Sequence, residues 1–104
     1  MSKNGRRGEI WTVELNGKRR PVVIVSNDNI IAELDHLIAT VSSKQVRNEF
    51  DVVIEWWKEA GLDKPSIVRC SKLHTLHYQE LLFRIGKLHE NDLERVLTTI
   101  RNYF

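Results

Sequence analysis

Few side chains in this sequence could carry out acid–base or nucleophilic chemistry near neutral pH. His74 and His77 could transfer protons, because imidazole has an unperturbed pKa close to neutrality. Histidines are more often ordinary surface residues, so both interpretations stay open. Cys70 is better interpreted as a small buried apolar residue than as a nucleophile, since the sequence shows no His and Asp arranged to activate it.

Two arginines offer a different chemistry, the binding of an anion. Arg20 precedes Pro21, which keeps it extended at the mouth of a predicted sheet. Arg69 interrupts an apolar segment, where an unpaired charge would be costly, so it needs a partner anion or solvent. A guanidinium suits phosphate but is a poor base, since its pKa lies above about 12. Each arginine could therefore bind a substrate anion or take part in a structural ion pair.

The sequence shows no pattern of metal ligands. Its four histidines, at positions 36, 74, 77 and 89, are scattered, and no Cys/His group has the spacing of a zinc site. We therefore expect no metal and no other cofactor. A single cysteine cannot form an internal disulfide, and no apolar run has the length of a signal sequence or a membrane span. These features predict a cytoplasmic protein without membrane attachment.

Length and composition predict one globular domain. A chain of 104 residues leaves little room for a second core, so we expect a single domain over residues 1–104. Hydrophobic residues make up 41% of the chain, which is enough to build a core and argues against disorder. The net charge of +2 permits a polyanionic partner without requiring one.

The elements that must position these residues are mostly strands. Residues 8–15 alternate between apolar and polar side chains, which is typical of a half-buried strand. Asn16-Gly17 accepts positive φ at both central positions of a type I′ turn, and residues 21–25 form a continuous apolar run. The sequence therefore predicts that the first two strands form a tight hairpin.

Shorter elements follow along the chain. Residues 30–36 are compatible with either a loop or a short helix. We expect strands at 37–41, 50–57 and 66–70, a helical turn at 77–82 and a brief strand at 83–88. Alternation turns Trp11 and Trp56 toward the core and leaves Trp57 outward, where it could stack on a base.

The C-terminal segment predicts an amphipathic helix packed on the sheet. Acidic residues stand in its first turn, and Arg101 stands in its last. His89 occupies the N-cap position, where Ser or Asp would be stronger. The apolar stripe of this helix consists of Leu93, Val96, Leu97, Ile100 and Phe104.

Four segments, in this order and spacing, resemble the MazF/PemK endoribonucleases. They are residues 7–11 (RGEIW), 20–28 (RPVVIVSND), 66–70 (SIVRC) and 86–88 (GKL), followed by the final helix. The similarity spans nearly the whole chain. It implies an α+β fold that is mainly β: a small, strongly bent antiparallel sheet of the SH3-like, CcdB/PemK-like barrel type with a C-terminal amphipathic helix. It also implies a homodimer.

The resemblance implies the toxin of a toxin–antitoxin system, which inhibits growth by cutting single-stranded RNA, including messenger RNA, without a metal. In this reaction the ribose 2′-hydroxyl attacks its own phosphate and leaves a 2′,3′-cyclic phosphate and a free 5′-hydroxyl. The route needs a proton taken from the 2′-hydroxyl, a proton given to the departing oxygen, and cations against the phosphorane charge. The implied partner is an antitoxin whose acidic, disordered tail lies across a basic groove and the dimer interface.

The resemblance also assigns site residues. The family's arginine before proline corresponds to Arg20, and its hydroxyl residue after the third strand corresponds to Ser42, with Ser43 one position away. Arg69 matches an arginine that in some members starts a functional Arg-Cys-Asp segment, but here Ser71 replaces the acid. The predicted catalytic residues are therefore Arg20, Ser42 and Arg69. The predicted RNA-binding residues are Lys18, Arg19, Ser43, Lys44, Ser71, Lys72 and His74.

Two other functions remain open. A CcdB-type gyrase poison has the same fold but no enzymatic activity, and it acts through a C-terminal Trp-Gly-Ile, whereas this chain ends in Arg-Asn-Tyr-Phe. A catalytically inactive RNA-binding module is compatible with the loss of the acid at Ser71.

The first hairpin is also shorter than in many members of the family, which predicts an open site where Lys18 and Arg19 reach RNA phosphates directly.

Overall fold

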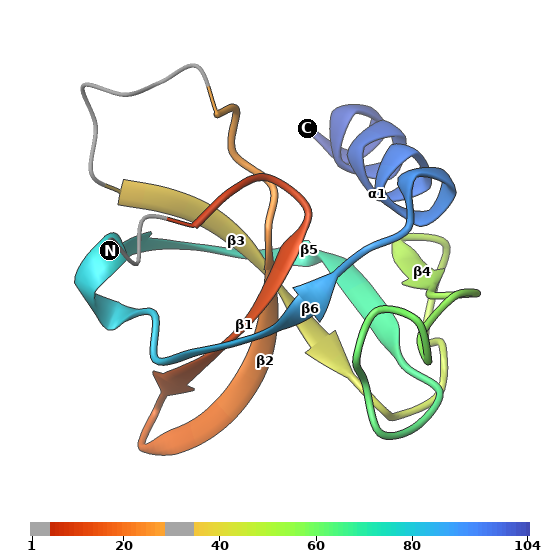
Figure 1. Cartoon of the computed structure of the whole chain (residues 1–104). Coiled ribbons are helices and arrows are strands. Elements are labelled where there is room, and N and C mark those ends of the chain that lie inside the picture. Colours follow the sequence, from red (N-terminus) through yellow and green to blue (C-terminus); the bar gives the residue numbers. More distant parts are fainter. Residues whose placement is uncertain (1–4, 29–34) are drawn as a thin grey trace.

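The computed structural model describes residues 5–28 and 35–104, and within them the chain forms one antiparallel sheet and one α-helix (Figure 1). The strand order is β4-β5-β3-β2-β1-β6. In chain order the elements are β1 (Glu9–Leu15), β2 (Lys18–Ile24), β3 (Asp35–Ser42), β4 (Asp51–Val53), β5 (Ile67–His77), the 3-10 helix η1 (Tyr78–Glu80), β6 (Phe83–Lys87) and α1 (Glu90–Tyr103). This architecture confirms the predicted mainly β fold with a C-terminal helix.

The β1–β2 hairpin forms as predicted. Asn16 has a φ of 53° and Gly17 a φ of 80°, so both central residues adopt the positive φ that a type I′ turn requires. Leu15 pairs with Lys18 immediately beside the turn. A two-residue connection leaves no loop that could fold over the neighbouring surface.

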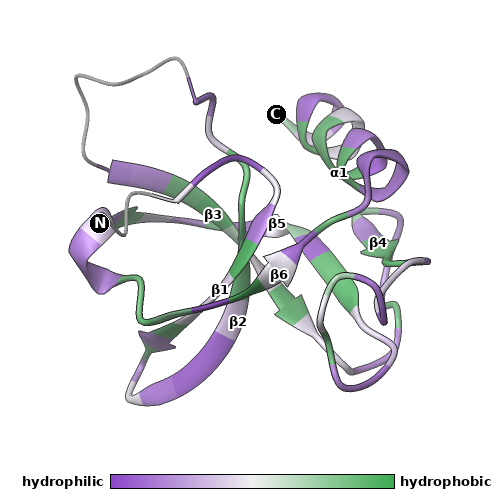
Figure 2. Ribbon diagram, viewed as in Figure 1, coloured by the Kyte–Doolittle hydropathy of each residue, from purple (hydrophilic) through white to green (hydrophobic). Residues whose placement is uncertain are grey.

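The central strands are apolar on both faces, as the continuous apolar run in β2 predicts. Successive residues of a strand point to opposite sides, so Val22 and Val23 enter different clusters. The first apolar cluster contains Ile10, Val23, Val25, Ala39, Val41, Val52, Ile54, Ala60, Val68, Cys70, Leu88 and Val96. The second apolar cluster contains Trp11, Val13, Val22, Ile24, Ile38, Leu76 and Leu81. Figure 2 shows that β2 itself changes from hydrophilic residues near the hairpin to hydrophobic residues at its other end.

Helix α1 packs against β4 and β5 and covers the first apolar cluster. His89 is its N-cap, and the Nδ1 atom of His89 accepts a hydrogen bond from the Asn91 N–H at 3.1 Å. Val96 is buried, and the partly buried residues of the stripe are Leu93, Leu97 and Ile100. Phe104, predicted on the same stripe, is instead 75% exposed: it follows the last helical residue, and its ring packs at 81° to the ring of Tyr103.

The predicted strand at 50–57 is much shorter than expected, because β4 ends at Val53. The chain turns there, and the buried carboxylate of Asp92 accepts hydrogen bonds from the N–H groups of Glu55 and Trp56, at 3.2 and 2.9 Å. The alternation argument therefore fails beyond β4. Trp56 is 39% exposed and stacks on His89, whereas Trp57 packs against the first apolar cluster, the reverse of the prediction.

Strand β5 is longer than the predicted 66–70 because it pairs with β3 along its whole length. The pairing is interrupted once: Ala39 pairs with Leu73 and the next residue, Thr40, pairs with Arg69, so residues 70–72 bulge out of register. The predicted loop or short helix at 30–36 lies outside the described residues up to residue 34, and β3 begins at Asp35.

Replacing Asp92 with alanine should reduce the free energy of unfolding by about 2–4 kcal/mol, because it leaves two partly buried N–H groups without their acceptor. Urea unfolding followed by tryptophan fluorescence measures this loss. Glu94→Ala is the matched control on the same helix, since its exposed ion pair with Arg101 should contribute less than about 1 kcal/mol. Equal losses in the two variants would contradict this role for Asp92.

Candidate functional site

A cavity of about 550 Å³ lies beside the β1–β2 hairpin. One wall comes from β2, and another comes from the end of β3 and the turn after it. The residues that these two walls contribute are Arg19, Arg20, Pro21, Val41, Ser42, Ser43 and Lys44. The cavity therefore brings together Arg20 and Ser42, the two leading catalytic candidates, with three of the predicted RNA-binding residues.

The strand register explains why Arg20 and Ser42 meet. Strands β2 and β3 pair antiparallel, with Val22 opposite Thr40. Because the strands run in opposite directions, moving two residues back along β2, from Val22 to Arg20, corresponds to moving two residues forward along β3, from Thr40 to Ser42. Continuing the register past the last pair thus places Arg20 opposite Ser42. At this point the two strands have stopped pairing, and the cavity opens between them.

The third wall of the cavity is the segment 61–66, which follows the turn after β4. This turn lies directly against β6, since a Cβ atom on Gly86 would be only 1.9 Å from the Ala60 carbonyl oxygen. Glycine is therefore required at position 86 for the turn to come this close. Gly86 belongs to the segment 86–88 that resembles the family. By letting the turn approach β6, it helps to place the segment 61–66 beside the cavity.

The charge of the lining is mainly positive. Four of the lining side chains are cationic, and Asp63 is the single carboxylate opposing them among those that line the cavity. Arg20 is exposed and has no ion pair within the described part of the chain, so the alternative of a structural ion pair finds no partner there. A concave cationic surface of this kind favours a phosphate-bearing ligand.

The Ser42 hydroxyl can act only as a hydrogen-bond donor toward the cavity. Its Oγ atom accepts hydrogen bonds from the Lys44 N–H at 3.1 Å and from Nη2 of Arg69 at 3.4 Å. Both lone pairs of the oxygen are then occupied, which leaves its hydrogen to be donated. Ser43 is exposed, and among the described residues its side chain makes no comparable bonds. The geometry therefore distinguishes Ser42 as the hydroxyl fixed at the cavity.

Arg69 lies behind Ser42 and does not line the cavity. It is 9% exposed, and its Nη1 atom donates to Oδ2 of Asp51 at 3.0 Å. Asp51, on β4, is the partner anion that the position of Arg69 required, and the sequence analysis did not identify it. The signal was the buried arginine itself, but the alternating pattern at 50–57 places Asp51 on the same face as Trp57, which was predicted to point outward.

The remaining predicted RNA-binding residues do not line this cavity. Lys18 is exposed at the end of the hairpin, Ser71 and Lys72 lie in the β5 bulge, and His74 is exposed opposite Ile38. His77, a candidate for proton transfer, caps η1: its Nδ1 atom accepts a hydrogen bond from the Gln79 N–H at 3.3 Å. That contact accounts for His77 structurally.

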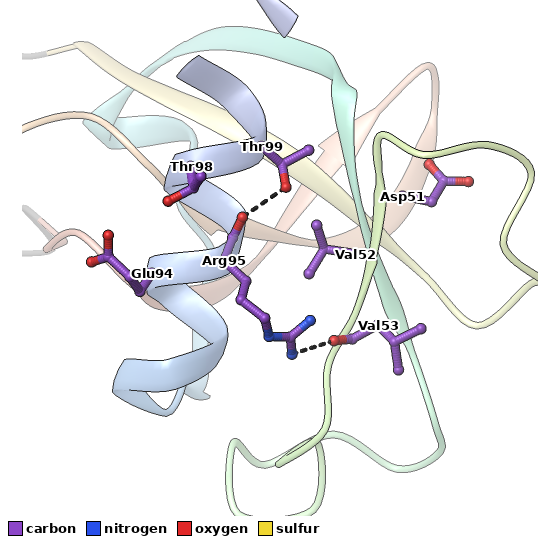
Figure 3. Close-up of a pocket in the computed structure, with 7 residues that line it drawn as sticks. All are labelled: Asp51, Val52, Val53, Glu94, Arg95, Thr98 and Thr99. Atoms are coloured by element: carbon purple, nitrogen blue, oxygen red, sulfur yellow. Dashed lines mark hydrogen bonds between the residues drawn. The ribbon is translucent and has the colours of Figure 1, made fainter. Parts of the chain in front are cut away.

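A second cavity, of about 460 Å³, lies between β4 and α1 (Figure 3). Its guanidinium, from Arg95, already donates to the Val53 carbonyl oxygen at 2.8 Å and pairs with Asp92. The view shows Val52 directed toward α1 and Asp51 directed away from it. Arg95 thus joins the helix to the sheet, while the carboxylate of Asp51 is directed away from the helix.

Cys70 is buried, as predicted for a small apolar residue. Burial, and to a smaller extent the negative charge of Asp51, together raise the pKa of its thiol from 9.0 to about 12. The thiol is therefore neutral at physiological pH. It is not a nucleophile in the folded protein.

The described residues show neither a cluster of metal ligands nor a membrane-spanning helix. Across residues 5–28 and 35–104, no three His, Cys, Asp or Glu side chains gather as a group that could hold a metal ion. None of the helical segments that the structure describes is long and apolar enough to span a membrane.

The fold and the cavity define a small β-sheet protein with a cationic site beside its first hairpin. The sequence matches, over residues 6–104, the family of the PemK-like, MazF-like toxins of type II toxin–antitoxin systems. The chain therefore belongs to this toxin family. None of the curated proteins matches the sequence.

Several solved structures share the fold. A mycobacterial endoribonuclease in complex with its cognate antitoxin has a TM-score of 0.84 at 18% identity, covering 94% of this chain and 92% of its own. The Mycobacterium tuberculosis toxin MazF-mt6 has a TM-score of 0.78 at 23% identity, with coverages of 90% and 93%. A MazE–MazF structure from Deinococcus radiodurans has a TM-score of 0.79 at 15% identity, with coverages of 95% and 93%. At these identities the likeness shows the fold.

The raised pKa of Cys70 predicts a protected thiol. At mildly alkaline pH, alkylation of the folded protein should be about three orders of magnitude slower than in urea, because a pKa near 12 instead of 9.0 reduces the thiolate fraction by that factor. Mass spectrometry of samples quenched over time measures both rates. Rapid labelling of the folded protein would contradict the burial of this side chain.

Proposed function

We propose that this toxin is an endoribonuclease that cuts single-stranded RNA at the cavity beside the β1–β2 hairpin. The observation that carries the proposal is the meeting of Arg20 and Ser42 in one cationic cavity. A guanidinium and a hydroxyl donor are the groups that an RNA phosphate needs as negative charge develops on its oxygens.

In the proposed reaction the ribose 2′-oxygen forms a bond to the adjacent phosphorus, and the bond from phosphorus to the 5′-oxygen breaks. The 2′-hydroxyl loses its proton, the departing 5′-oxygen gains one, and the products are a 2′,3′-cyclic phosphate and a 5′-hydroxyl. Arg20 stabilises the charge of the phosphorane through its planar fork. Ser42 donates its hydroxyl hydrogen to a phosphate oxygen.

The RNA strand is held by the cations around the cavity. Arg19, Lys44 and Lys64 line it together with Arg20, and each can neutralise a phosphate of the strand. The guanidinium of Arg19 also lies 5.5 Å from the centre of the exposed Phe83 ring. Because the hairpin ends in a two-residue turn, an extended strand can enter the cavity without the movement of a lid.

The proposal includes the partners that go with a toxin of this family. We infer an antitoxin with an acidic tail, because a cationic cavity is complementary to carboxylates and solved relatives are described as complexes with antitoxins. We also infer a homodimer acting in the cytoplasm. These inferences rest on the family and on the charge of the site.

The cavity favours a nuclease over the two other candidate functions. A gyrase-binding toxin acting through its C-terminus does not require a cationic cavity at the first hairpin. An inactive RNA-binding module would use the same cations, so only a cleavage assay separates it from the nuclease. RNA bound without cleavage would favour the module, and neither binding nor cleavage of RNA would favour the gyrase-type function.

Purified protein should cleave a mixed-sequence single-stranded RNA equally well with and without EDTA. The products should carry 2′,3′-cyclic phosphate and 5′-hydroxyl ends, identified by mass spectrometry. A substrate with deoxyribose on the 5′ side of the scissile phosphate should resist, since it lacks the attacking hydroxyl. Cleavage of that substrate at the rate of RNA would exclude the internal-attack mechanism.

Arg20→Ala should lower the cleavage rate by about 100-fold or more, because it removes a cation from the phosphorane. Arg20→Lys tests the planar fork, since it keeps the charge and loses the bidentate contact. Both variants should keep the wild-type melting temperature, because Arg20 is exposed. The matched control is Arg101→Ala, an exposed arginine on α1, and wild-type activity in Arg20→Ala would remove this residue from the site.

A further inference from the structure

Three side chains from three strands form a continuous series of contacts that ends at the cavity. Oδ2 of Asp51 on β4 accepts a hydrogen bond from Nη1 of Arg69 on β5 at 3.0 Å. Nη2 of the same guanidinium donates to Oγ of Ser42, at the end of β3, over 3.4 Å. The series therefore links a fully buried carboxylate to the hydroxyl that lines the cavity.

The strand pairing fixes the order of these residues. Arg69 pairs with Thr40 on one side and with Asp51 on the other, so β5 lies between the strands that carry Ser42 and Asp51. Asp51 is itself held by the Arg47 N–H, which donates to Oδ2 at 2.8 Å. Because a guanidinium is a rigid plane, fixing Nη1 on the carboxylate also fixes the direction of Nη2.

Stability alone is a weak reason for this arrangement. The side chain of Asp51 is 0% exposed, and its Oδ1 atom has no hydrogen-bond partner within the described part of the chain. A buried ion pair costs desolvation that well-packed apolar residues would avoid. What the charged pair provides, and an apolar pair could not, is a donor aimed at Ser42.

We propose that Asp51 is a positioning residue, which acts through Arg69 to hold the Ser42 hydroxyl as a hydrogen-bond donor toward the scissile phosphate. The inference rests on the proposed function. With Arg69 and the Lys44 N–H donating to its oxygen, Ser42 can direct only its hydrogen into the cavity. Without Asp51, the guanidinium loses its orientation and the hydroxyl can rotate.

A double-mutant cycle between Asp51 and Ser42 tests this coupling through the single-turnover cleavage rate and the KM for RNA. Ser42→Ala should slow cleavage by about 100-fold and Asp51→Asn by about tenfold, each with little change in KM. In the Ser42→Ala background, Asp51→Asn should slow cleavage by less than about twofold, because the group it positions is already absent. A merely structural Asp51 would slow cleavage by the same factor in both backgrounds.

Arg69→Lys provides a second variant that keeps the buried carboxylate paired. A lysine ammonium can reach Asp51, but its single nitrogen cannot also hold the direction toward Ser42 that the guanidinium fork fixes. This variant should fold, as judged by circular dichroism, and should still lose about tenfold in rate. The loss should again disappear in the Ser42→Ala background, even if Asp51→Asn proves too unstable to study.

A matched control tests whether closeness to Asp51 alone is enough to affect cleavage. The Nε atom of Arg47 lies 3.6 Å from Oδ2 of Asp51, but no contact links the Arg47 side chain to Ser42, so Arg47→Ala should retain activity within about twofold.

The possible outcomes are distinct. A wild-type protein that cuts no RNA would contradict the proposed function, and this inference with it. A wild-type protein that cuts RNA, with independent losses from Asp51→Asn and Ser42→Ala, would contradict the inference alone. A fully active Ser42→Ala would contradict both the inference and the role of Ser42 in the proposed reaction.

Discussion

The buried ion pair between Asp51 and Arg69 is the interaction on which the site depends. It joins β4 to β5 inside the protein, where neither charge could remain unpaired without a large desolvation cost. The same guanidinium reaches Ser42, so the pair that joins two strands also orients a hydroxyl at the cavity. The negative charge of Asp51 also affects Cys70, because it contributes to the raised pKa of that thiol.

The sheet that carries this pair has to bury two apolar faces with few elements. Helix α1 covers the first apolar cluster, while the strands curve around the second. At the hairpin end β2 becomes polar, and its arginines leave the core just where its pairing with β3 stops. A site open to solvent thus lies directly beside a tightly packed interior, and the rigid interior holds the groups of the site in place.

The change from acid to serine after Cys70 gains a structural context from this arrangement. The family resemblance implies that some members have a functional acid two residues after the arginine. In this chain that position is Ser71, which lies in the β5 bulge. The carboxylate that Arg69 contacts comes instead from Asp51, on the neighbouring strand. The loss of an acid at position 71 therefore does not leave the arginine without a carboxylate, which weakens the argument for an inactive module.

Local chemistry was enough to predict much of the molecule. The Asn16-Gly17 turn, the apolar run of β2 and the helical stripe follow from φ preferences and hydrophobic periods, which act over a few residues. Contacts between distant residues decided the rest. Strand β4 stops early because Asp92, far along the chain, binds the N–H groups that follow it, and this reverses the two tryptophans. The partner of Arg69 was hidden for the same reason, since strand pairing, which sequence spacing does not encode, brings Asp51 and Ser42 to either side of it.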